Sequence, residues 1–490
     1  MSLNLAFDIA RGGLSTSSTA TSVVSRNIAN VGDPDASRKT ANIVSSAAGG
    51  VHVDGIGNAV DVALFESLLE ANSSHGELAA ISDAHEQLES IILDPELGHS
   101  PAALVGELGA SLQAAAAAPH DESVARAAIS SAVALAQGLN AAAQTVDAVR
   151  AEADSALARS VERLQTLLDD FEEVNNQVVS GTVLGTDTTD ALDRRNGLLR
   201  EMSWLVELRS TVRTNNDVVL FAANGATLFE TVPRSVAIDP TATLAPGQPG
   251  GTLRIDGVPA SPAGSGALGG TIGGLIQVRD VVGVTFGRQL DEVARGLIVA
   301  FAESDQSVAP AQPDLAGLFT YGGGPALPPS GVISDGLAAQ ITVNPNVDVA
   351  QGGLASRLRD GGISVPGDPS YVYNSANAAG FADRLRQLVD RLSGSQPFDQ
   401  GAGLGTGASV REFAADSAGW LEQARQTSSG KLADKSVLSE RANAAWQNRV
   451  GVNLDEELTE LIALERSYQA STRLISSVNG MFDALFRATG

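Results

Sequence analysis

The last forty residues contain the stretch LDEELTELIALERSYQASTRLISSVNGMFDAL, which spans residues 454–485. Hydrophobic residues recur in it every seven positions, and a second set follows three residues later, which is the seam of a coiled-coil-like helix. The first set is Leu454, Leu461, Tyr468, Ile475 and Phe482, and the second is Leu464, Ser471, Val478 and Leu485. Three acidic residues at its start and Arg487 near its end suit the helix dipole. We therefore expect a packing helix from about Asn453 to Arg487.

The beginning of the chain shows the same spacing. Its seam is Leu3, Phe7, Ala10, Leu14, Ser17, Thr21, Val24, Ile28 and Val31. The middle of this seam is small and hydroxylated, and such side chains compete for backbone hydrogen bonds, so the helix should need a partner. Chain ends usually fray, so two helices this regular indicate assembly, although both could also be core helices of one globular bundle.

The centre of the chain alternates between helical and strand-like patterns. Helical spacing runs through most of the first two hundred residues, interrupted by Pro95, Pro101 and Pro119. From Val212 the period becomes strand-like, and Asn224-Gly225 between apolar runs is a hairpin signal. We expect a flexible joint at residues 264–274, a helix over about 275–302, irregular structure over 310–366, and helices again from about residue 376.

Composition excludes several classes of function. The chain has 490 residues, of which 32 are basic and 57 acidic, and its net charge of −25 repels phosphate backbones and anionic membranes. With no Cys it has no disulfide and no thiolate nucleophile. The first residues lack the pattern of a cleaved signal peptide, and the longest uncharged stretch, residues 257–278, is too rich in Gly and Pro for a membrane span. We expect neither nucleic acid nor membrane as a partner.

No motif supports catalysis. Residues 264–269 spell a dinucleotide fingerprint but follow a Pro-rich loop rather than a buried strand, so a plain Gly-rich loop is the better interpretation. The histidines show no metal-ligand spacing with carboxylates, and His85 on an apolar helical stripe is most simply a packed residue; they are His52, His75, His85, His99 and His120. We therefore expect no enzyme, no catalytic residue, no metal and no cofactor.

The C-terminal end carries a family resemblance. Residues 451–458 (GVNLDEEL), followed by Leu461-Ile462, Tyr468-Gln469-Ala470, residues 473–475 (RLI) and residues 481–485 (MFDAL), closely resemble the C-terminal helix of hook-associated protein 1, the hook-filament junction branch of the flagellar rod, hook and hook-associated family. Rod and hook proteins share several of these positions. The lead-in GVNLDEE resembles the junction branch in particular.

The N-terminal end is similar to the same family through residues 25–31 (SRNIANV). The family continues with a Gly-Tyr pair where this chain has Asp35-Ala36 before Ser37-Arg38-Lys39. Weaker similarity appears at residues 273–280, 289–291 and 341–345. The region from residue 304 to 366 is short for the family, which implies that a large outer domain is absent.

Together these observations predict a mainly α fold with a small β subdomain, paired N- and C-terminal coiled-coil helices, and an elongated multi-domain shape. Residues 1–35 with 452–490 should form an inner coiled-coil domain, and residues 36–211 with 270–303 and 375–451 a helical rod-like domain. Residues 212–269 should form a β-hairpin-rich subdomain. Residues 304–374 should form a short irregular or β outer segment.

The resemblance implies a non-enzymatic structural role in the extracellular bacterial flagellum. Members form a homo-oligomeric ring at the end of the hook, contact the hook protein and a second junction protein, bind an export chaperone, and leave the cell by flagellar type III export without a cleaved signal. The alternatives are a hook or rod protein and, from another class, a secreted adhesin or enzyme with flagellar-type ends. The expected interface residues are Leu3, Phe7, Leu14, Val24, Ile28, Leu454, Leu461, Tyr468, Ile475, Val478, Phe482 and Leu485.

Overall fold

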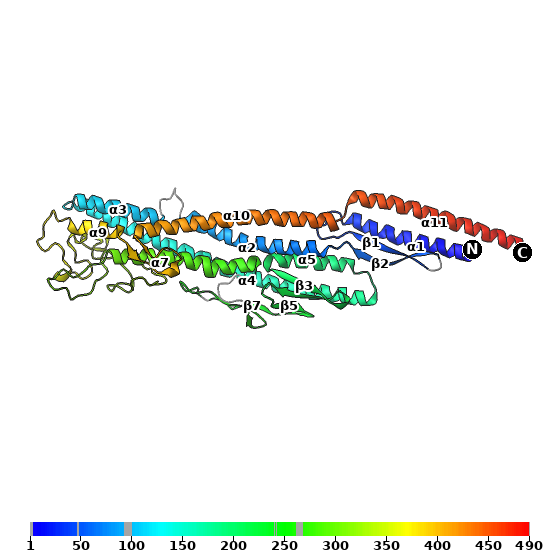
Figure 1. The fold of residues 1–490 in the computed structure, drawn as a ribbon, viewed down its shortest axis with the longest axis horizontal. Helices are drawn as coiled ribbons and strands as arrows, with labels where there is room; N and C mark the ends of the chain where they lie inside the picture. The colour runs from blue at the N-terminus through cyan, green and yellow to red at the C-terminus, as the bar shows by residue number, and fades with distance from the viewer. Residues whose placement is uncertain are drawn as a thin grey trace.

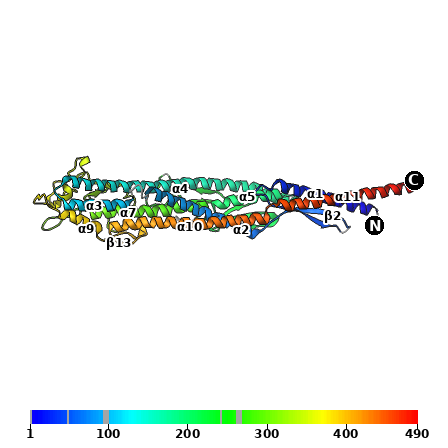
Figure 2. The same ribbon diagram turned by 90° about the horizontal axis from the view of Figure 1, so that it is seen from above.

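The computed structural model describes residues 3–46, 49–92, 100–239, 241, 243–260 and 268–489. The molecule is a long rod with both chain ends at the same tip (Figures 1 and 2). Its helices are α1 (Leu3–Ala29), α2 (Val62–Ile92), α3 (Pro101–Ala117), α4 (Glu122–Leu184), α5 (Thr189–Leu205), α6 (Gly270–Gln277), α7 (Gly283–Ala300), α8 (Arg357–Asp360), α9 (Asp383–Ser393), α10 (Val410–Val450) and α11 (Leu454–Thr489). The predicted mainly α, elongated fold with paired terminal helices is confirmed.

The strands form five small antiparallel sheets within the described residues. They are β1 (Lys39–Ser45) with β2 (Val51–Asn58); β3 (Leu208–Val212), β4 (Val218–Ala222), β5 (Thr227–Glu230) and β6 (Val232–Pro233); β7 (Val236–Ile238), β8 (Leu253–Ile255) and β9 (Val258–Pro259); β10 (Phe319–Thr320) with β11 (Thr342–Val343); and β12 (Gln396–Pro397) with β13 (Gly407–Ala408).

Helix α4 is the spine of the rod. It has 63 residues, and the residue before it, Asp121, is its N-cap, whose carboxylate accepts a hydrogen bond from Ser123 N. The residue after it, Gly185, adopts the left-handed conformation (φ 67°) that favours glycine at a helix C-terminus. Its apolar face contributes to two core clusters, one at each half of the rod; Leu139 lies in one and Phe171 in the other. A single helix therefore ties both halves together.

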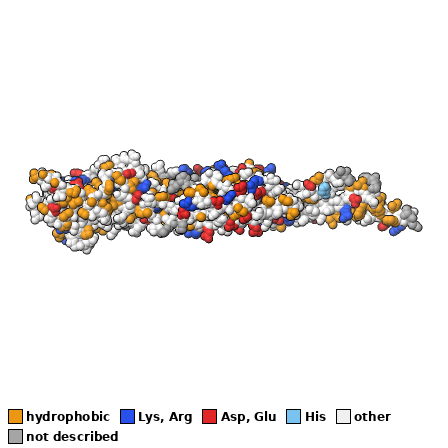
Figure 3. Space-filling view, turned by 90° about the horizontal axis from the view of Figure 1, so that it is seen from below, with side chains coloured by type: hydrophobic (Ala, Val, Ile, Leu, Met, Phe, Trp, Pro, Cys, Tyr) orange, Lys and Arg blue, Asp and Glu red, His pale blue; other side chains and the backbone are white. Residues whose placement is uncertain are grey.

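Charged and apolar side chains are distributed unevenly along the surface. Asp, Glu, Lys and Arg gather on the middle of the rod, whereas hydrophobic side chains gather at the end away from the termini (Figure 3). That end is capped by the segment 304–374, which consists of turns, short strands and the single-turn α8. Its residues Leu318, Phe319 and Ile341 are buried in the same core cluster as α3 and α7. This segment therefore closes the end of the bundle.

The β subdomain lies on the side of α4 near the middle of the rod (Figure 1). Asn224-Gly225 forms the turn between β4 and β5, as predicted, with Gly225 at φ 83°. The expected start at residue 212 differs from the structure, because β3 already begins at Leu208 and pairs with β4 along its whole length. The buried Leu208 follows the end of α5 closely. No loop of turn-forming residues in the sequence therefore indicates the change from helix to strand.

The first two hundred residues hold a hairpin that the helical pattern does not predict. Strands β1 and β2 pair over residues 39–58, inside the range expected to be helical. Most side chains of this hairpin are exposed, so its strands lack the alternation of buried and polar residues that identifies a half-buried strand. The region expected to be dominated by helices, residues 36–211, therefore begins with a hairpin.

The expected flexible joint at residues 264–274 also differs from the structure. Residues 264–267 lie outside the described residues, but Gly270 already begins α6, which continues through a π-helical turn (Val278–Val282) into α7. A Cβ at Gly274 would lie 2.4 Å from the backbone oxygen of Glu77 on α2. These glycines therefore allow α6 to approach α2 closely, rather than making the chain flexible.

Asp291 on α7 clamps the capping segment to the bundle. Its carboxylate accepts hydrogen bonds from Gly336 N at 2.8 Å and Ala338 N at 2.7 Å. Asn140 on α4 donates to the carbonyl oxygens of Ala338 and Ile341 beside it. Burial raises the pKa of Asp291 from 3.8 to about 7 in spite of the two N–H donors.

This raised pKa predicts a pH dependence. Between about pH 4 and about pH 7 the folded chain holds a proton that the unfolded chain has released, so the free energy of unfolding falls as the pH rises and levels off above pH 7. Asp291→Asn should remove the contribution of Asp291 to this fall, which amounts in total to at most about 4 kcal/mol between pH 4 and pH 7. Urea titrations at several pH values measure it, with the exposed Asp314→Asn as control. An unchanged slope in Asp291→Asn would contradict the assignment.

Candidate functional site

The candidate site is the terminal module, defined as α1, α11 and the β1–β2 hairpin. Helices α1 and α11 lie side by side at the tip of the rod (Figures 1 and 2). Of the twelve expected interface residues, Val24 and Val478 are buried. Partly buried are Leu3, Phe7, Leu14, Ile28, Leu461, Ile475 and Phe482. Leu454, Tyr468 and Leu485 are 41%, 45% and 53% exposed, so much of their surface faces away from α1.

Small side chains in the middle of α1 set how closely the two helices approach. Ser17 Oγ donates a hydrogen bond to Ser467 Oγ at 3.1 Å, linking the helices across the seam. A Cβ placed on Gly13 would come within 3.2 Å of Ser471 Oγ. The hydroxylated stretch that is a poor helix former by itself therefore has its partner in α11.

The hairpin covers the other side of α1. Thr16 Oγ1 donates to the carbonyl oxygen of Val51 at 3.1 Å, and a Cβ on Gly12 would lie 3.0 Å from the same oxygen. The terminal module thus has three layers, with the hairpin, α1 and α11 in that order. Sequence reasoning missed the hairpin layer, although the pair Gly12-Gly13 in a helix pattern indicates a close backbone approach.

The module joins the rod through a buried carboxylate. Glu457 in the first turn of α11 is fully buried. Its Oε2 accepts a hydrogen bond from Asn27 Nδ2 at 2.9 Å, and its Oε1 accepts one from Arg38 Nε at 2.6 Å. Asn27 is 1% exposed and also bonds both backbone groups of Lys39. This joint brings together the end of α1, the start of β1 and the start of α11.

Arg38 extends the joint to the end of α10. Its backbone N–H donates to the carbonyl oxygen of Val450 at 2.7 Å, and its guanidinium also reaches Glu460 at 3.0 Å. The hydrogen bond to Glu457 raises the pKa of Arg38 above its ordinary value. The short link between α10 and α11 is therefore held by the same residue that pairs with the buried carboxylate.

A second set of contacts attaches the joint to α5. Lys39, 3% exposed, pairs through Nζ with Asp190 and with Asp193 Oδ2 at 3.3 Å. The hydrogen bond from Lys39 lowers the pKa of Asp190, whereas burial raises the pKa of Asp193. Asp193 Oδ1 accepts from Ser37 Oγ at 2.5 Å and from Asn58 Nδ2 at 2.7 Å. Both ends of the hairpin are thus bound to the rod.

The turn that departs from the family pattern takes part in this attachment. Asp35 N donates to Asp33 Oδ1 at 2.9 Å, which closes the turn, and the Asp35 carboxylate pairs with Arg200 on α5. On the last turn of α1, Arg26 pairs with Asp187 at 2.6 Å. That hydrogen bond raises the pKa of Arg26. The altered turn is therefore attached to α5 by the Asp35–Arg200 ion pair.

The outer surface of α11 carries apolar side chains that α1 does not cover. Four of them were not among the expected interface residues, and their exposed fractions lie between 42% and 57%: Leu458, Ile462, Leu474 and Met481. In a helical projection they flank the α1-facing seam on both sides. Exposed apolar side chains that adjoin along one helix are typical of sites where another protein chain binds.

Two further sequence features have plain structural roles. His85 is buried between α2 and α10, where its Nδ1 lies 3.1 Å from Ser428 Oγ, and burial lowers its pKa. It is a packed residue, as expected. Of the fingerprint-like loop, only Leu268 and Gly269 lie within the described residues, directly before α6; His99 lies outside them. Among the described residues no cluster of three His, Cys, Asp or Glu could hold a metal ion.

Two known protein families match parts of this chain, one in the rod and one in the terminal module. Residues 85–308 match the family described as the flagellar hook-associated protein FlgK helical domain. Over this part, just under half of its length, the chain is similar to the FlgK helical domain. Residues 447–488 match the C-terminal family of flagellar basal body rod FlgEFG proteins, and this match contains Glu457 and nearly all of α11. The match to the FlgK helical domain therefore runs from the last two turns of α2 to just beyond the end of α7.

Among solved structures, the flagellar hook junction protein FlgK from Burkholderia pseudomallei matches with 23% identity and a TM-score of 0.43. The match covers 52% of this chain and 47% of that one, so it spans about half the length of that protein. No curated protein sequence matches the chain. Within the described residues, no helix combines the length and the apolar character that a membrane span requires.

The structure of the joint predicts that substitution of Glu457 destabilises it much more than the same substitution of the neighbouring Glu456. Glu457→Gln replaces the buried carboxylate that Arg38, 29% exposed, pairs with, and should destabilise the joint by about 2 kcal/mol through the lost charge-assisted hydrogen bond. Hydrogen exchange at residues 36–40 and 453–458 should then speed up at least tenfold. The matched control is Glu456→Gln, since Glu456 is 61% exposed and 3.8 Å from Arg38. Equal protection in both variants would show that the buried carboxylate does not hold the joint.

Proposed function

We propose that this chain is the structural component that joins the flagellar hook to the filament. The match of residues 85–308 to the FlgK helical domain carries this proposal. The terminal module supports it, because a connector between two polymers needs a rigid body and an end that packs with other subunits. In this role the chain is non-enzymatic and lies outside the cell.

The partners follow from the same proposal. The terminal modules of several copies pack into a ring, in which the uncovered apolar residues of α11 contact neighbouring subunits. The hook protein lies on one side of this ring and a second junction protein on the other. Before assembly, α11 is the segment that an export chaperone covers, since an amphipathic helix is a natural ligand for an apolar groove. Export uses the flagellar type III route.

A strain that lacks this chain tests the role. Electron microscopy should show intact hooks without filaments, and flagellin should accumulate in the medium, because the filament has no base on which to polymerise. Complementation with the full chain should restore filaments. Absence of hooks would instead support the alternative hook or rod protein, in line with the rod-type match at residues 447–488. Normal filaments would support the adhesin or enzyme alternative.

Removal of the C-terminal segment tests the partners. Deletion of residues 452–490 removes α11 and should abolish chaperone binding and incorporation into flagella, because both need the α11 surface. The rod should remain folded, since its two core clusters contain no residue of α11. Circular dichroism checks the fold, and chaperone pull-down with a motility assay checks the function. Unchanged motility would contradict the proposed role of α11.

A further inference from the structure

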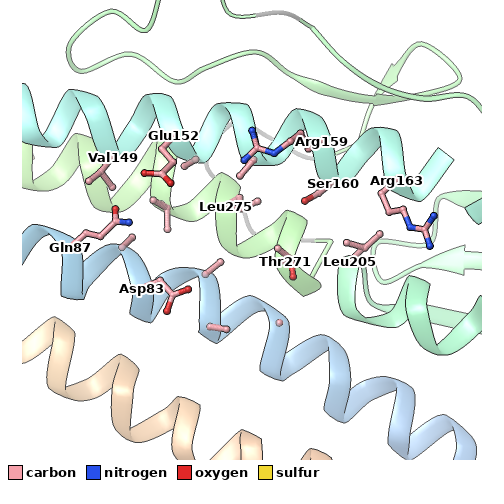
Figure 4. Close-up of a pocket in the computed structure, with 17 residues that line it drawn as sticks. Asp83, Gln87, Val149, Glu152, Arg159, Ser160, Arg163, Leu205, Thr271 and Leu275 are labelled. Atoms are coloured by element: carbon pink, nitrogen blue, oxygen red, sulfur yellow. The ribbon is translucent and has the colours of Figure 1, made fainter. Parts of the chain in front are cut away.

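Surface charge on the rod is mixed rather than sorted. A hollow of about 560 Å³ lies between α2 and α4, and both acidic and basic side chains line it, among them Asp83, Glu152, Arg159 and Arg163 (Figure 4). Such a mixed rim does not select one partner by charge. Helix α11 in the terminal module is different, because its charged side chains and its uncovered apolar side chains are each sorted along the helix and around it.

Five of the apolar side chains that α1 leaves uncovered on α11 form two patches at different heights. The basal patch lies in the first turns of the helix and consists of the exposed Leu454, Leu458 and Ile462. The tip patch lies nearer the end of the helix and consists of the exposed Leu474 and Met481. In a helical projection the mean directions of the two patches differ by about 150°, so they lie on opposite flanks of α11.

The charged residues of α11 differ between these two heights. Glu456 and Glu460 lie on the same flank as the tip patch, but at the height of the basal patch, where both reach Arg38. Beside the tip patch, the described residues of that flank carry no charge. The other exposed residues there are small, namely Ala470, Ser477, Ala484 and Ala488. Basic side chains lie instead on the side opposite α1, at Arg466, Arg473 and Arg487.

Two copies that stand at the same height cannot bury these patches against each other. The basal patch of one copy would then face Glu456 and Glu460 of the next, so that Leu458 would cover carboxylates and take them out of water. Burial of a charge is costly, and here it would also compete with the ion pairs to Arg38. Packing of these flanks at equal height is therefore disfavoured.

A shift of one copy by about 19 residues, or about 28 Å along the helix, brings the two patches to one height. Ile462 of the first copy then lies level with Met481 of the second. Leu454 of the first copy lies within one residue of the level of Leu474. Apolar side chains thus meet apolar side chains, and the two glutamates of the flank lie outside the contact between the α11 helices.

The same shift brings opposite charges together at the edge of the contact. Asp455 comes within one residue of the level of Arg473, and Glu465 comes within one helical turn of the level of Arg487. Neither acid forms an ion pair in the described part of its own chain. Arg466 also approaches the level of Arg487, but both lie on the water-facing side of α11, where screening weakens their repulsion. The charges therefore favour the shifted arrangement.

We propose that neighbouring copies of this chain pack their α11 helices side by side with an axial offset of about 28 Å, the basal patch of one copy against the tip patch of the next. Every copy carries both patches on opposite flanks, so each contact leaves a patch free for a further neighbour, and the contact repeats from copy to copy. This inference rests on the proposed function, which places several copies side by side in one direction. It adds which flanks meet and that the copies are staggered.

Cysteine cross-linking tests the offset, because the chain has no Cys. Two differently tagged variants, Ile462→Cys and Met481→Cys, are co-expressed in a strain without the native chain, and whole flagella are oxidised. A mixed disulfide dimer is expected, since the two residues lie at one height on facing flanks. The control pairs Ile462→Cys with Ala463→Cys, because Ala463 lies on the same line of α11 as Met481 but about 27 Å nearer the rod. The control should give at least fivefold less dimer.

The outcomes separate this contact from the proposed function. If the native chain is absent from purified flagella, the junction role is wrong. If it is present and the Met481→Cys pair gives no more dimer than the Ala463→Cys control, the staggered contact is wrong and the junction role stands. Absence of dimer from both pairs would show that a different protein covers these flanks, which also overturns the contact. The pair Leu454→Cys with Leu474→Cys repeats the measurement if the first variants do not enter the flagella.

Charge reversal gives a second measurement of the same contact. Asp455→Arg in the Ile462→Cys copy places two cations at one height and should lower the dimer yield at least threefold. Arg473→Asp in the Met481→Cys copy should then restore the yield, because the opposite charges face each other again. The matched control is Asp483→Arg in the Ile462→Cys copy, since the exposed Asp483 lies beyond the contact and its reversal should not change the yield. Failure of the restoration overturns the contact.

Discussion

The buried carboxylate of Glu457 is the constraint on which the architecture of this chain depends. A charge out of contact with water is stable only when donors surround it, and here Asn27 and Arg38 supply them. These donors come from the other end of the chain, more than four hundred residues away. The first and last helices are therefore held together at the base of the terminal module, and the direction of that module relative to the rod is set there.

The rod supplies the rigid body to which this joint is attached. One continuous helix, α4, passes through both core clusters, so the two halves cannot bend independently without opening a packed core. Close contacts reinforce it, most clearly where Gly274 lets α6 lie against α2. The joint is attached to the rod through α5, because Lys39 forms ion pairs with Asp190 and Asp193 on that helix. The proposed role as a connector between two polymers needs this combination of a stiff body and a fixed end.

Much of the fold could be predicted from periodicity, because a helix that buries one face repeats its apolar residues regularly. The terminal helices, the long helices of the rod and the Asn224-Gly225 turn all follow from such local patterns. The β1–β2 hairpin could not be predicted, since its strands are largely exposed and have no buried face to encode. The glycines near residue 270 were misleading, because the same residue type serves flexible loops and close helix contacts.

The sequence by itself determined that both chain ends are helices with an apolar seam and, through the resemblance at residues 451–485, indicated the flagellar rod, hook and hook-associated proteins. It also contained Asn27 and Glu457 within the two terminal signatures, but nothing in a linear pattern says that they touch. Only the tertiary structure decided that contact and the hairpin layer over α1. Each of these depends on residues distant in the chain, whose meeting is set by packing and charge in three dimensions rather than by local spacing.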